Sequence, residues 1–307
     1  MLINPLFLGD IMGYIYLVFS VLAGALNAFG SKKQSNFTST VTSAAFSSFM
    51  RMAASVLTGA LLIFATEETY ALSSGATALL ALASAAVFSA YVILWIFSVR
   101  RGAFMLSSVF VMMGVVVTVG LSAVFFQEKI TVLHILGLAV LIAASLVMCS
   151  YSSEIKGRIT VTSIIILILC GALSGIYDFL QKLFVAMVDN ASSAAYNFYT
   201  YLFTGIILGI FTIVFNRPVF KGEEKLSSVF KNTLPYAVLM GISTLLCYYL
   251  KTIAAKYLPS AVIYPMYQGI ILPLMSVVSA VFFKEKITVK SAIGIALAIV
   301  SVCLINM

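Results

Sequence analysis

Ten long runs of apolar residues dominate this chain, and short connections separate most of them. An α-helix needs about 20 apolar residues to cross the hydrocarbon core of a bilayer. The sequence therefore predicts an all-α integral membrane protein with ten transmembrane helices. The predicted spans are 11–30, 41–64, 76–98, 103–126, 131–150, 161–184, 192–215, 234–254, 260–283 and 288–306, and the polar stretch 216–233 is predicted to be an aqueous loop.

Composition agrees with lipid as the main solvent. Apolar residues make up 62% of the sequence and charged residues 9%, whereas a soluble domain has about a quarter of its residues charged. The net charge of +8 would suggest a nucleic-acid partner for a soluble protein, but basic loops at a membrane explain it here. We expect a multi-pass protein of the cell membrane, a bacterial inner or plasma membrane, with the lipid bilayer and no nucleic acid as its partner.

One decapeptide occurs twice. AVFFQEKITV at 123–132 returns as AVFFKEKITV at 280–289, with nine of ten letters identical at an offset of 157 residues. Each copy connects the fourth and fifth span of a half, so five helices followed by five helices is the simplest explanation. A second copy that follows five crossings enters the membrane from the opposite side. We predict two inverted five-helix repeats, 1–152 and 153–307, an arrangement that secondary transporters use around a site at the midplane.

Each copy of the decapeptide also fits a helix end. Phe125 and Phe126 end an apolar span, Glu128 and Lys129 then lie in the interface, and Thr131 is predicted to cap the next helix. The equivalent residues of the second copy are Phe282, Phe283, Glu285, Lys286 and Thr288. We expect both glutamates to be structural residues.

The distribution of basic loop residues bears on orientation. Lys129 and Lys256 follow even-numbered spans, and thirteen basic residues follow odd-numbered spans, which favours both termini outside the cytoplasm. The thirteen are Lys32, Lys33, Arg100, Arg101, Lys156, Arg158, Arg217, Lys221, Lys225, Lys231, Lys284, Lys286 and Lys290.

The chain resembles the EamA-like ten-helix members of the drug/metabolite transporter superfamily. The resemblance covers nearly the whole chain and rests on the five-plus-five spans, on the turns QEKIT and KEKIT, and on Arg51 in SSFMRMAAS. It implies transport of small organic metabolites or amphipathic drugs, with no cofactor. Gln127 and Lys284 stand where such proteins often have glycine, and the resemblance implies cytoplasmic termini, contrary to the loop count.

Ionisable residues inside the spans are the first candidates for substrate contact, because they are costly in lipid. Arg51 is either an anchor for a carboxylate or phosphate, or one member of an internal ion pair, or a side chain that snorkels to the membrane surface. Asp178 and Lys182 lie four residues apart on one helix face, so they form a self-satisfied pair or leave Asp178 to titrate or bind an ammonium group. Asn27 has a similar place in the first half. Lys251 is predicted to snorkel to the membrane surface.

The span that begins SAVIYPMYQGIILPLM contains Pro265, Gly269 and Pro273, which interrupt or weaken a helix. Interrupted helices often form transporter sites. Tyr264 and Gln268 share a face beside these residues, and both are candidates for substrate contact. The alternative is a kinked helix whose role is packing.

Two aromatic sets are further candidates for binding a ligand by stacking or by cation–π contact. Tyr91 and Trp95 lie four residues apart, and Tyr196 and Tyr199 begin the seventh span. Membrane proteins also place such rings at the lipid interface, and this interpretation is favoured. The Gly171–Gly175 pair has the GxxxG spacing that allows close helix packing within the chain or in a dimer, so a monomer and a homodimer both remain open.

A secondary transporter for a small-molecule metabolite, working by alternating access, is the function these features favour. A channel or a non-transporting receptor is the alternative. A membrane-embedded enzyme is less favoured, because His134 is the single histidine and no catalytic motif is present. The four cysteines lack metal-ligand spacing and are interpreted as small core residues, so no metal or other cofactor is expected.

Overall fold

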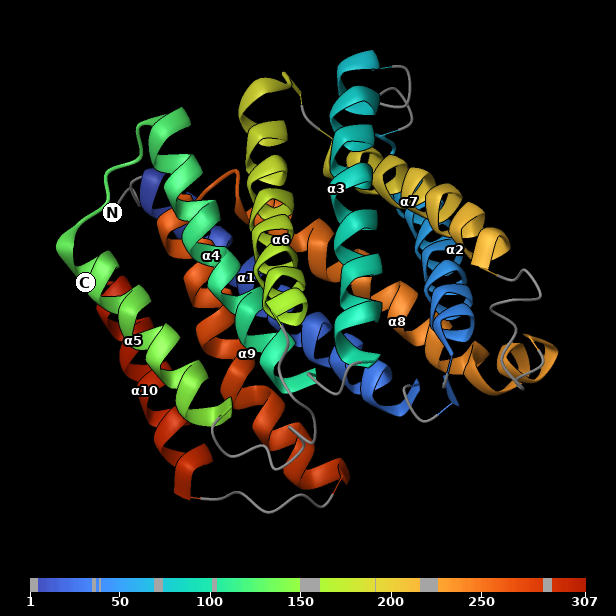
Figure 1. Ribbon diagram of the computed structural model, residues 1–307. Coiled ribbons are helices and arrows are strands. Elements are labelled where there is room, and N and C mark those ends of the chain that lie inside the picture. Colours follow the sequence, from blue (N-terminus) through green and yellow to red (C-terminus); the bar gives the residue numbers. More distant parts are fainter. Residues whose placement is uncertain are drawn as a thin grey trace.

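A computed structural model describes residues 5–34, 37–38, 40–68, 74–100, 104–149, 161–190, 192–215, 226–283 and 289–307. These residues form ten α-helices, and each predicted span corresponds to one of them (Figure 1). The helices are α1 (Pro5–Gln34), α2 (Val41–Ala65), α3 (Gly75–Arg100), α4 (Phe104–Phe126), α5 (Val132–Cys149), α6 (Val161–Met187), α7 (Ser193–Phe215), α8 (Leu226–Ala254), α9 (Ser260–Phe283) and α10 (Val289–Ile305).

Seven of the described helices are long and apolar enough to cross a membrane. Within the described residues, the apolar segments of α4, α5 and α10 are shorter; they are Phe110–Phe126, Val132–Ala144 and Ala292–Ile305. The prediction of a loop over 216–233 is wrong in its second part, because α8 already begins at Leu226 and continues through Pro235. Residues 216–225 lie outside the described part of the chain.

The surface is apolar and the interior is rich in small polar groups. Leu57, Leu61 and Phe64 form a stripe along α2, and each is about 70% exposed. Ser84 and Thr118 are completely buried. Contiguous exposed apolar surface on this scale is not found on soluble monomers, so lipid must cover the outside of the helices.

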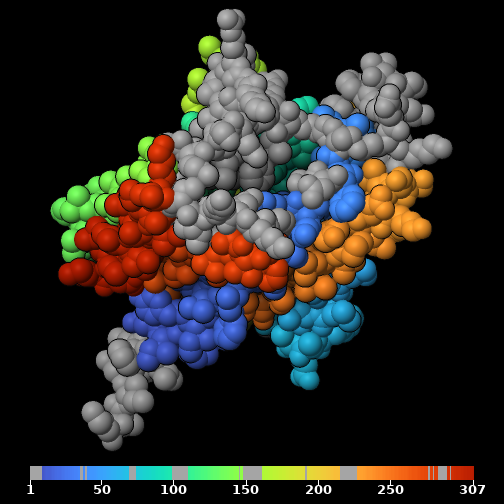
Figure 2. Space-filling model, turned by 90° about the horizontal axis from the view of Figure 1, so that it is seen from below, coloured from blue at the N-terminus to red at the C-terminus, as the bar shows by residue number. Residues whose placement is uncertain are grey.

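The main helix contacts follow the same pattern in the two halves. Each helix of the first half corresponds to the helix five positions later, so α1 corresponds to α6, α3 to α8 and α4 to α9. α1 packs on α8 as α6 packs on α3, and α4 packs on α6 as α9 packs on α1. The pairs α2–α7 and α5–α10 map onto themselves and lie at opposite ends of the molecule (Figure 1). Viewed at right angles, the blue atoms of α1 adjoin the orange atoms of α8 and α9 (Figure 2). This exchange pattern is the one expected of two five-helix repeats related by a two-fold axis.

Both ends of the described chain lie on one face of the bundle, which we call the termini face. The Tyr14 hydroxyl on α1 donates to Asn306 Oδ1 beyond α10, at 3.1 Å. On the same face the Ser192 hydroxyl, before α7, donates to the Glu68 carboxylate, after α2. The connections after even-numbered helices therefore meet on one side, as ten alternating crossings require.

The GxxxG pair of α6 packs against α4 of the same chain. A methyl group added to Gly171 would meet the carbonyl oxygen of Phe110, and one added to Gly175 would meet that of Gly114. This close approach of two helices accounts for the motif without a dimer. The oligomeric state stays open.

The first copy of the repeated decapeptide forms the turn between α4 and α5. Thr131 caps α5 as predicted, since its hydroxyl accepts from the His134 backbone N–H at 3.3 Å, while His134 Nδ1 accepts from the Thr131 N–H at 3.2 Å. Gln127 has a φ of 53°, the left-handed conformation that favours glycine. In the second copy, residues 284–288 lie outside the described residues.

Candidate functional site

An ion pair is buried at the centre of the second half. The Lys251 ammonium of α8 donates to Asp178 Oδ1 of α6 at 2.6 Å, and the two side chains are 3% and 9% exposed. Asp178 lies within the apolar helix α6 and Lys251 in the last turn of α8, and both side chains are buried, where isolated charges are costly. The pair neutralises two buried charges and ties α6 to α8.

Two predictions about these charges are wrong. Asp178 does not pair with Lys182, and Lys251 does not snorkel to a membrane surface. Lys182 instead lies 3.7 Å from Glu128 Oε1 and donates to the carbonyl oxygens of Ala255 and Leu258 at 2.8 and 3.0 Å. The i, i+4 spacing allowed a pair on one helix, but closer partners on other helices are available to both groups.

Hydrogen bonds extend the Asp178–Lys251 pair to α7. Gln181 Nε2 donates to Asp178 Oδ1 at 3.4 Å, and the Thr252 hydroxyl is 3.2 Å from Gln181 Oε1. Asn197 Nδ2 lies 3.3 Å from the same Thr252 hydroxyl. All of these side chains are buried, so the network fixes three helices relative to one another.

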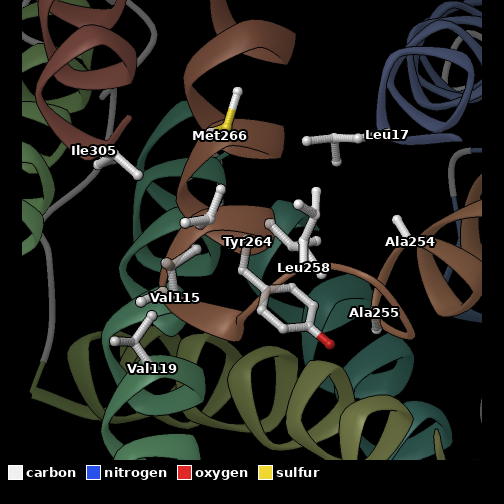
Figure 3. Close-up of a cluster of buried hydrophobic side chains, with 12 residues drawn as sticks. Leu17, Val115, Val119, Ala254, Ala255, Leu258, Tyr264, Met266 and Ile305 are labelled. Carbon is white, nitrogen blue, oxygen red and sulfur yellow. The ribbon is translucent and has the colours of Figure 1, made fainter. Parts of the chain in front are cut away.

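Three tyrosine rings surround the Lys251 ammonium. Its Nζ lies 4.4 Å from the ring centre of Tyr248, 4.9 Å from that of Tyr267 and 5.6 Å from that of Tyr264, within the range of cation–π attraction. Figure 3 shows the Tyr264 ring leaving α9 with its hydroxyl directed away from Met266 and Ile305. This hydroxyl donates to the Asp178 carbonyl oxygen at 2.7 Å. We call Asp178, Lys251 and these three rings the central cluster.

A second group of rings adjoins the central cluster around Phe88 of α3. The Phe88 ring lies 4.6 Å from Tyr177, 5.9 Å from Tyr248 and 6.0 Å from Tyr201, measured between ring centres. Tyr91 lies 5.8 Å away on the same helix. Helices α3, α6, α7 and α8 therefore meet at one aromatic group, with contributions from both halves of the chain.

Arg51 of α2 adjoins this aromatic group. The neighbours of its guanidinium include Tyr91, Tyr201 and Tyr248, which belong to three other helices. Arg51 Nε is buried with no hydrogen-bond partner, and no carboxylate pairs with Arg51 within the described part of the chain. An internal ion pair, one of the predicted explanations for Arg51, is therefore not found among those residues.

The other predicted site residues have different surroundings, and they are not members of the central cluster. Trp95 stands next to Tyr91, with 6.2 Å between ring centres. Asn27 has a buried side-chain oxygen without a partner. Gln268 is half-buried and is not part of the central cluster. Tyr196 is fully buried, stacks on Phe184 at 4.2 Å and shares a 2.6 Å hydrogen bond with Ser84.

Tyr199 lies at the edge of the bundle. It is half-buried and stacks on Phe203, with 5.9 Å between ring centres. The tyrosines at the start of α7 therefore separate into Tyr196, which is a packing residue of the core, and Tyr199 near the outside. Pro265 and Pro273 do not break α9, which continues from Ser260 to Phe283.

Sequence reasoning missed Tyr177, Tyr248, Tyr267 and Phe88 as part of the centre. A pattern that could have indicated the Tyr248–Lys251 contact is present in CYYLKTIAA, where a lysine in an apolar span follows a tyrosine by three residues. Three residues is a helical spacing that brings ring and ammonium together. No group of three or more His, Cys, Asp or Glu side chains that could hold a metal is found where the structure describes the chain.

The cysteines do not share one environment. Cys170 and Cys247 are buried and free, in agreement with their interpretation as core residues, but Cys303 is exposed on α10. The Cys247 thiol lies 3.2 Å from the Tyr267 hydroxyl.

Comparisons with known proteins identify the class of molecule. Residues 161–307 match the model of the EamA-like transporter family. The quaternary ammonium compound-resistance protein QacG of Staphylococcus sp. (strain ST94) is 30% identical over 108 residues, which is 35% of this chain and 92% of that protein. This chain is an EamA-like member of the drug/metabolite transporter superfamily. It is a multi-pass membrane transporter of the drug/metabolite type, as its sequence motifs suggested.

A solved structure supports the fold of this EamA-like chain. The match has a TM-score of 0.75 at 12% sequence identity and covers 96% of this chain and 95% of the other, whose title reads "Crystal structure of protein". At this identity the likeness concerns the fold alone. It extends over both halves, whereas the family model matches the second half.

Proposed function

We propose that this protein is a secondary transporter that binds a small polar or amphipathic organic metabolite between its halves. The observation that carries the proposal is the set of three ionised groups, Arg51, Asp178 and Lys251, placed among aromatic rings inside a lipid-covered bundle. Ionisable side chains within membrane segments usually serve a substrate or ion pathway. We place the transporter in the cell membrane.

Space for a substrate is supported by the exposure of the rings. Arg51, Tyr91, Tyr248 and Tyr267 retain accessible surface although several helices surround them. Deep side chains keep accessible surface when open space lies beside them. Of the residues predicted from sequence, we propose Arg51, Tyr91, Asp178 and Tyr264 for the site, with Asn27, Trp95 and Gln268 at its margin.

The remaining predicted residues are assigned other roles. Tyr196 and Tyr199 are proposed to pack the α7 end, since their rings are engaged with Phe184 and Phe203. Lys182 is proposed to hold the termini face closed together with Glu128. The Glu128 carboxylate accepts from the Ser260 N–H at 2.8 Å and so caps α9 while it attracts Lys182.

Alternating access is the mechanism we propose. Repeats 1–152 and 153–307 would have opposite orientations and rock against each other, as in other transporters built from inverted repeats. The exchange symmetry of helix packing supports this division. The contacts of Glu128 with Lys182 and Ser260 join α4, α6 and α9 on the termini face, and they must break when that face opens.

Counterflow in proteoliposomes tests the proposal. Vesicles with purified protein are loaded with an unlabelled metabolite and then given a trace of the labelled compound outside. A transporter gives a transient, saturable accumulation of label that liposomes without protein lack. Electrical currents far above transporter turnover rates would instead indicate a channel, and the absence of accumulation across a broad metabolite library would contradict the proposal.

Export of a quaternary ammonium compound is the second candidate. QacG is named for resistance to such compounds, and tyrosine rings attract quaternary cations. In this chain Lys251 already occupies the rings of the central cluster. A quaternary cation would have to displace it or bind beside Arg51. The same counterflow assay with labelled benzyltrimethylammonium, a quaternary ammonium cation, tests this candidate.

A further inference from the structure

We infer that the substrate is an organic anion with a single negative charge, a carboxylate attached to a planar or aromatic body, and that Arg51 binds the carboxylate. This inference rests on the proposed function and names the substrate class of the same site. It follows from three observations: the charge balance of the interior, the unused hydrogen-bonding capacity of Arg51, and the rings that surround it.

The charge balance comes first. The buried charges in question are those of Arg51 in the middle of α2, Asp178 in α6 and Lys251 in the last turn of α8. Lys182, also on α6, is balanced by Glu128 at 3.7 Å. Asp178 and Lys251 neutralise each other across 2.6 Å, so Arg51 leaves one uncompensated positive charge. A buried charge is stable only when it is paired. One bound monoanion makes the interior neutral, whereas a dianion leaves a net negative charge and a cation leaves two positive charges.

The geometry of Arg51 points to a carboxylate. Its Nε is buried without a partner, and the groups found near its guanidinium are the tyrosines Tyr91, Tyr201 and Tyr248. A guanidinium presents parallel N–H donors that match the two oxygens of a carboxylate. Tyrosine hydroxyls can supply further donors to the same anion. Neighbours of this kind can complete a carboxylate site but cannot neutralise the arginine.

The aromatic rings define the rest of the ligand. Tyr91 and Tyr248 are neighbours of Arg51, and Tyr248 also contacts Lys251. The Phe88 ring centre lies 5.8 Å from that of Tyr91 and 5.9 Å from that of Tyr248. Rings at such distances favour an aromatic or planar body by offset or edge contacts. A carboxylate on Arg51 would direct this body along the rings toward the central cluster.

Three probes that each contain a phenyl ring but differ in charge test which ligand charge the site prefers. They are phenylacetate (an anion), phenylacetamide (neutral) and benzyltrimethylammonium (a cation). Binding is read from Trp95, the single tryptophan of the chain, whose ring centre lies 6.2 Å from Tyr91. Excitation at wavelengths above the absorption of the probes isolates its emission. We expect saturable quenching by phenylacetate at a Kd at least tenfold below that of phenylacetamide, and no competition from benzyltrimethylammonium.

Variants assign the effect to Arg51. Arg51→Met should abolish the preference for phenylacetate over phenylacetamide, and Arg51→Lys should keep the preference but weaken it, because the charge stays while the two-pronged donor is lost. Lys290→Met, at an exposed position of α10, removes a positive charge elsewhere and should change nothing. Because wild-type protein alone compares the three probes, the test does not depend on the folding of any variant.

The outcomes separate this inference from the proposed function. Tighter binding of benzyltrimethylammonium than of phenylacetate, no saturable phenylacetate binding, or a preference that survives in Arg51→Met overturns the anion assignment. Counterflow of a cation but not of phenylacetate overturns the assignment and leaves the transporter standing. Arg51-dependent phenylacetate binding without counterflow of any compound supports the assignment and contradicts transport.

Discussion

Removing one member of the Asp178–Lys251 pair should destabilise the protein far more than removing both. The two side chains meet at 2.6 Å and are almost fully buried. Loss of one partner leaves an unpaired buried charge, which costs about 3–5 kcal/mol. Replacement of both members by uncharged groups removes the charge problem altogether, and such double replacements are often neutral or stabilising.

A double-mutant cycle makes this argument quantitative. Asp178→Asn and Lys251→Met should each lower the free energy of unfolding by about 3–5 kcal/mol, and the double variant should lose much less than their sum. Lys251 also contacts the rings of Tyr248 and Tyr267, so the double variant should not regain full stability. We expect a coupling energy of at least about 2 kcal/mol, near the upper range for residues in direct contact.

Thermal unfolding in detergent, followed with a thiol-reactive dye, is a suitable assay. Cys170 and Cys247 are buried and become reactive on unfolding, whereas Cys303 is exposed and is replaced by serine in every variant. The Glu128–Lys182 pair is the matched control. At 3.7 Å instead of 2.6 Å, and with Lys182 also donating to two backbone carbonyl oxygens, it should show a coupling energy at the low end of the range for residues in contact, about 0.5 kcal/mol.

A double variant as unstable as the sum of the two single variants would refute the reasoning. It would mean that Asp178 and Lys251 stabilise the fold through separate contacts and that the 2.6 Å pair carries little energy. Equal coupling at Glu128–Lys182 would also contradict the argument, because the shorter distance between Asp178 and Lys251 would then have no influence on the strength of the ion pair.

Three further predictions concern packing, the turn and the termini face. Gly114→Ala should destabilise the protein by about 1–3 kcal/mol or more, because the new methyl group meets the backbone of α6, whereas Gly120→Ala on the same helix meets nothing within 4 Å and should be harmless in the same melting assay. Gln127→Gly should stabilise it by roughly 1 kcal/mol, since φ is 53°; no gain would exclude strain at this turn. Glu128→Gln should increase the labelling rate of a cysteine introduced for Ala255, a buried residue whose carbonyl oxygen accepts from Lys182, because the Glu128–Lys182 ion pair at 3.7 Å is lost; an unchanged rate would remove Glu128 as a contact that closes this face.

Sequence alone was sufficient to find the helices, because twenty-residue apolar runs have few alternatives in a membrane. The exception is instructive. Residues Leu226–Thr233 are polar enough to be interpreted as a loop, yet they form the first turns of α8. A polar segment next to a span can continue its helix outside the lipid, and hydropathy does not distinguish this extension from a coil.

The charged centre was only partly predictable. Asp178 and Arg51 were identified because ionisable groups in apolar runs are conspicuous, and the spacing of Asp178 and Lys182 suggested a local pair. The true partner, Lys251, is 73 residues away on another helix. Which helix face meets which neighbour is decided by tertiary packing, and the sequence of one chain does not contain that information in a local pattern.

The proposed repeat explains why helix packing is alike in the two halves while their buried charged residues differ. Gly24 and Gly175 occupy comparable places in α1 and α6, and each faces the counterpart helix, since Gly24 packs on Tyr267 of α9 and Gly175 on Gly114 of α4. Three residues further on, the first half has Asn27 where the second has Asp178. If the halves are two-fold related repeats, as we propose, close helix packing must be the same in both. A charge pair is needed once, so the Asp178–Lys251 pair in the second half and Arg51 in the first make the interior asymmetric. An asymmetric interior can orient a ligand that has one charged end, which a symmetric one cannot do.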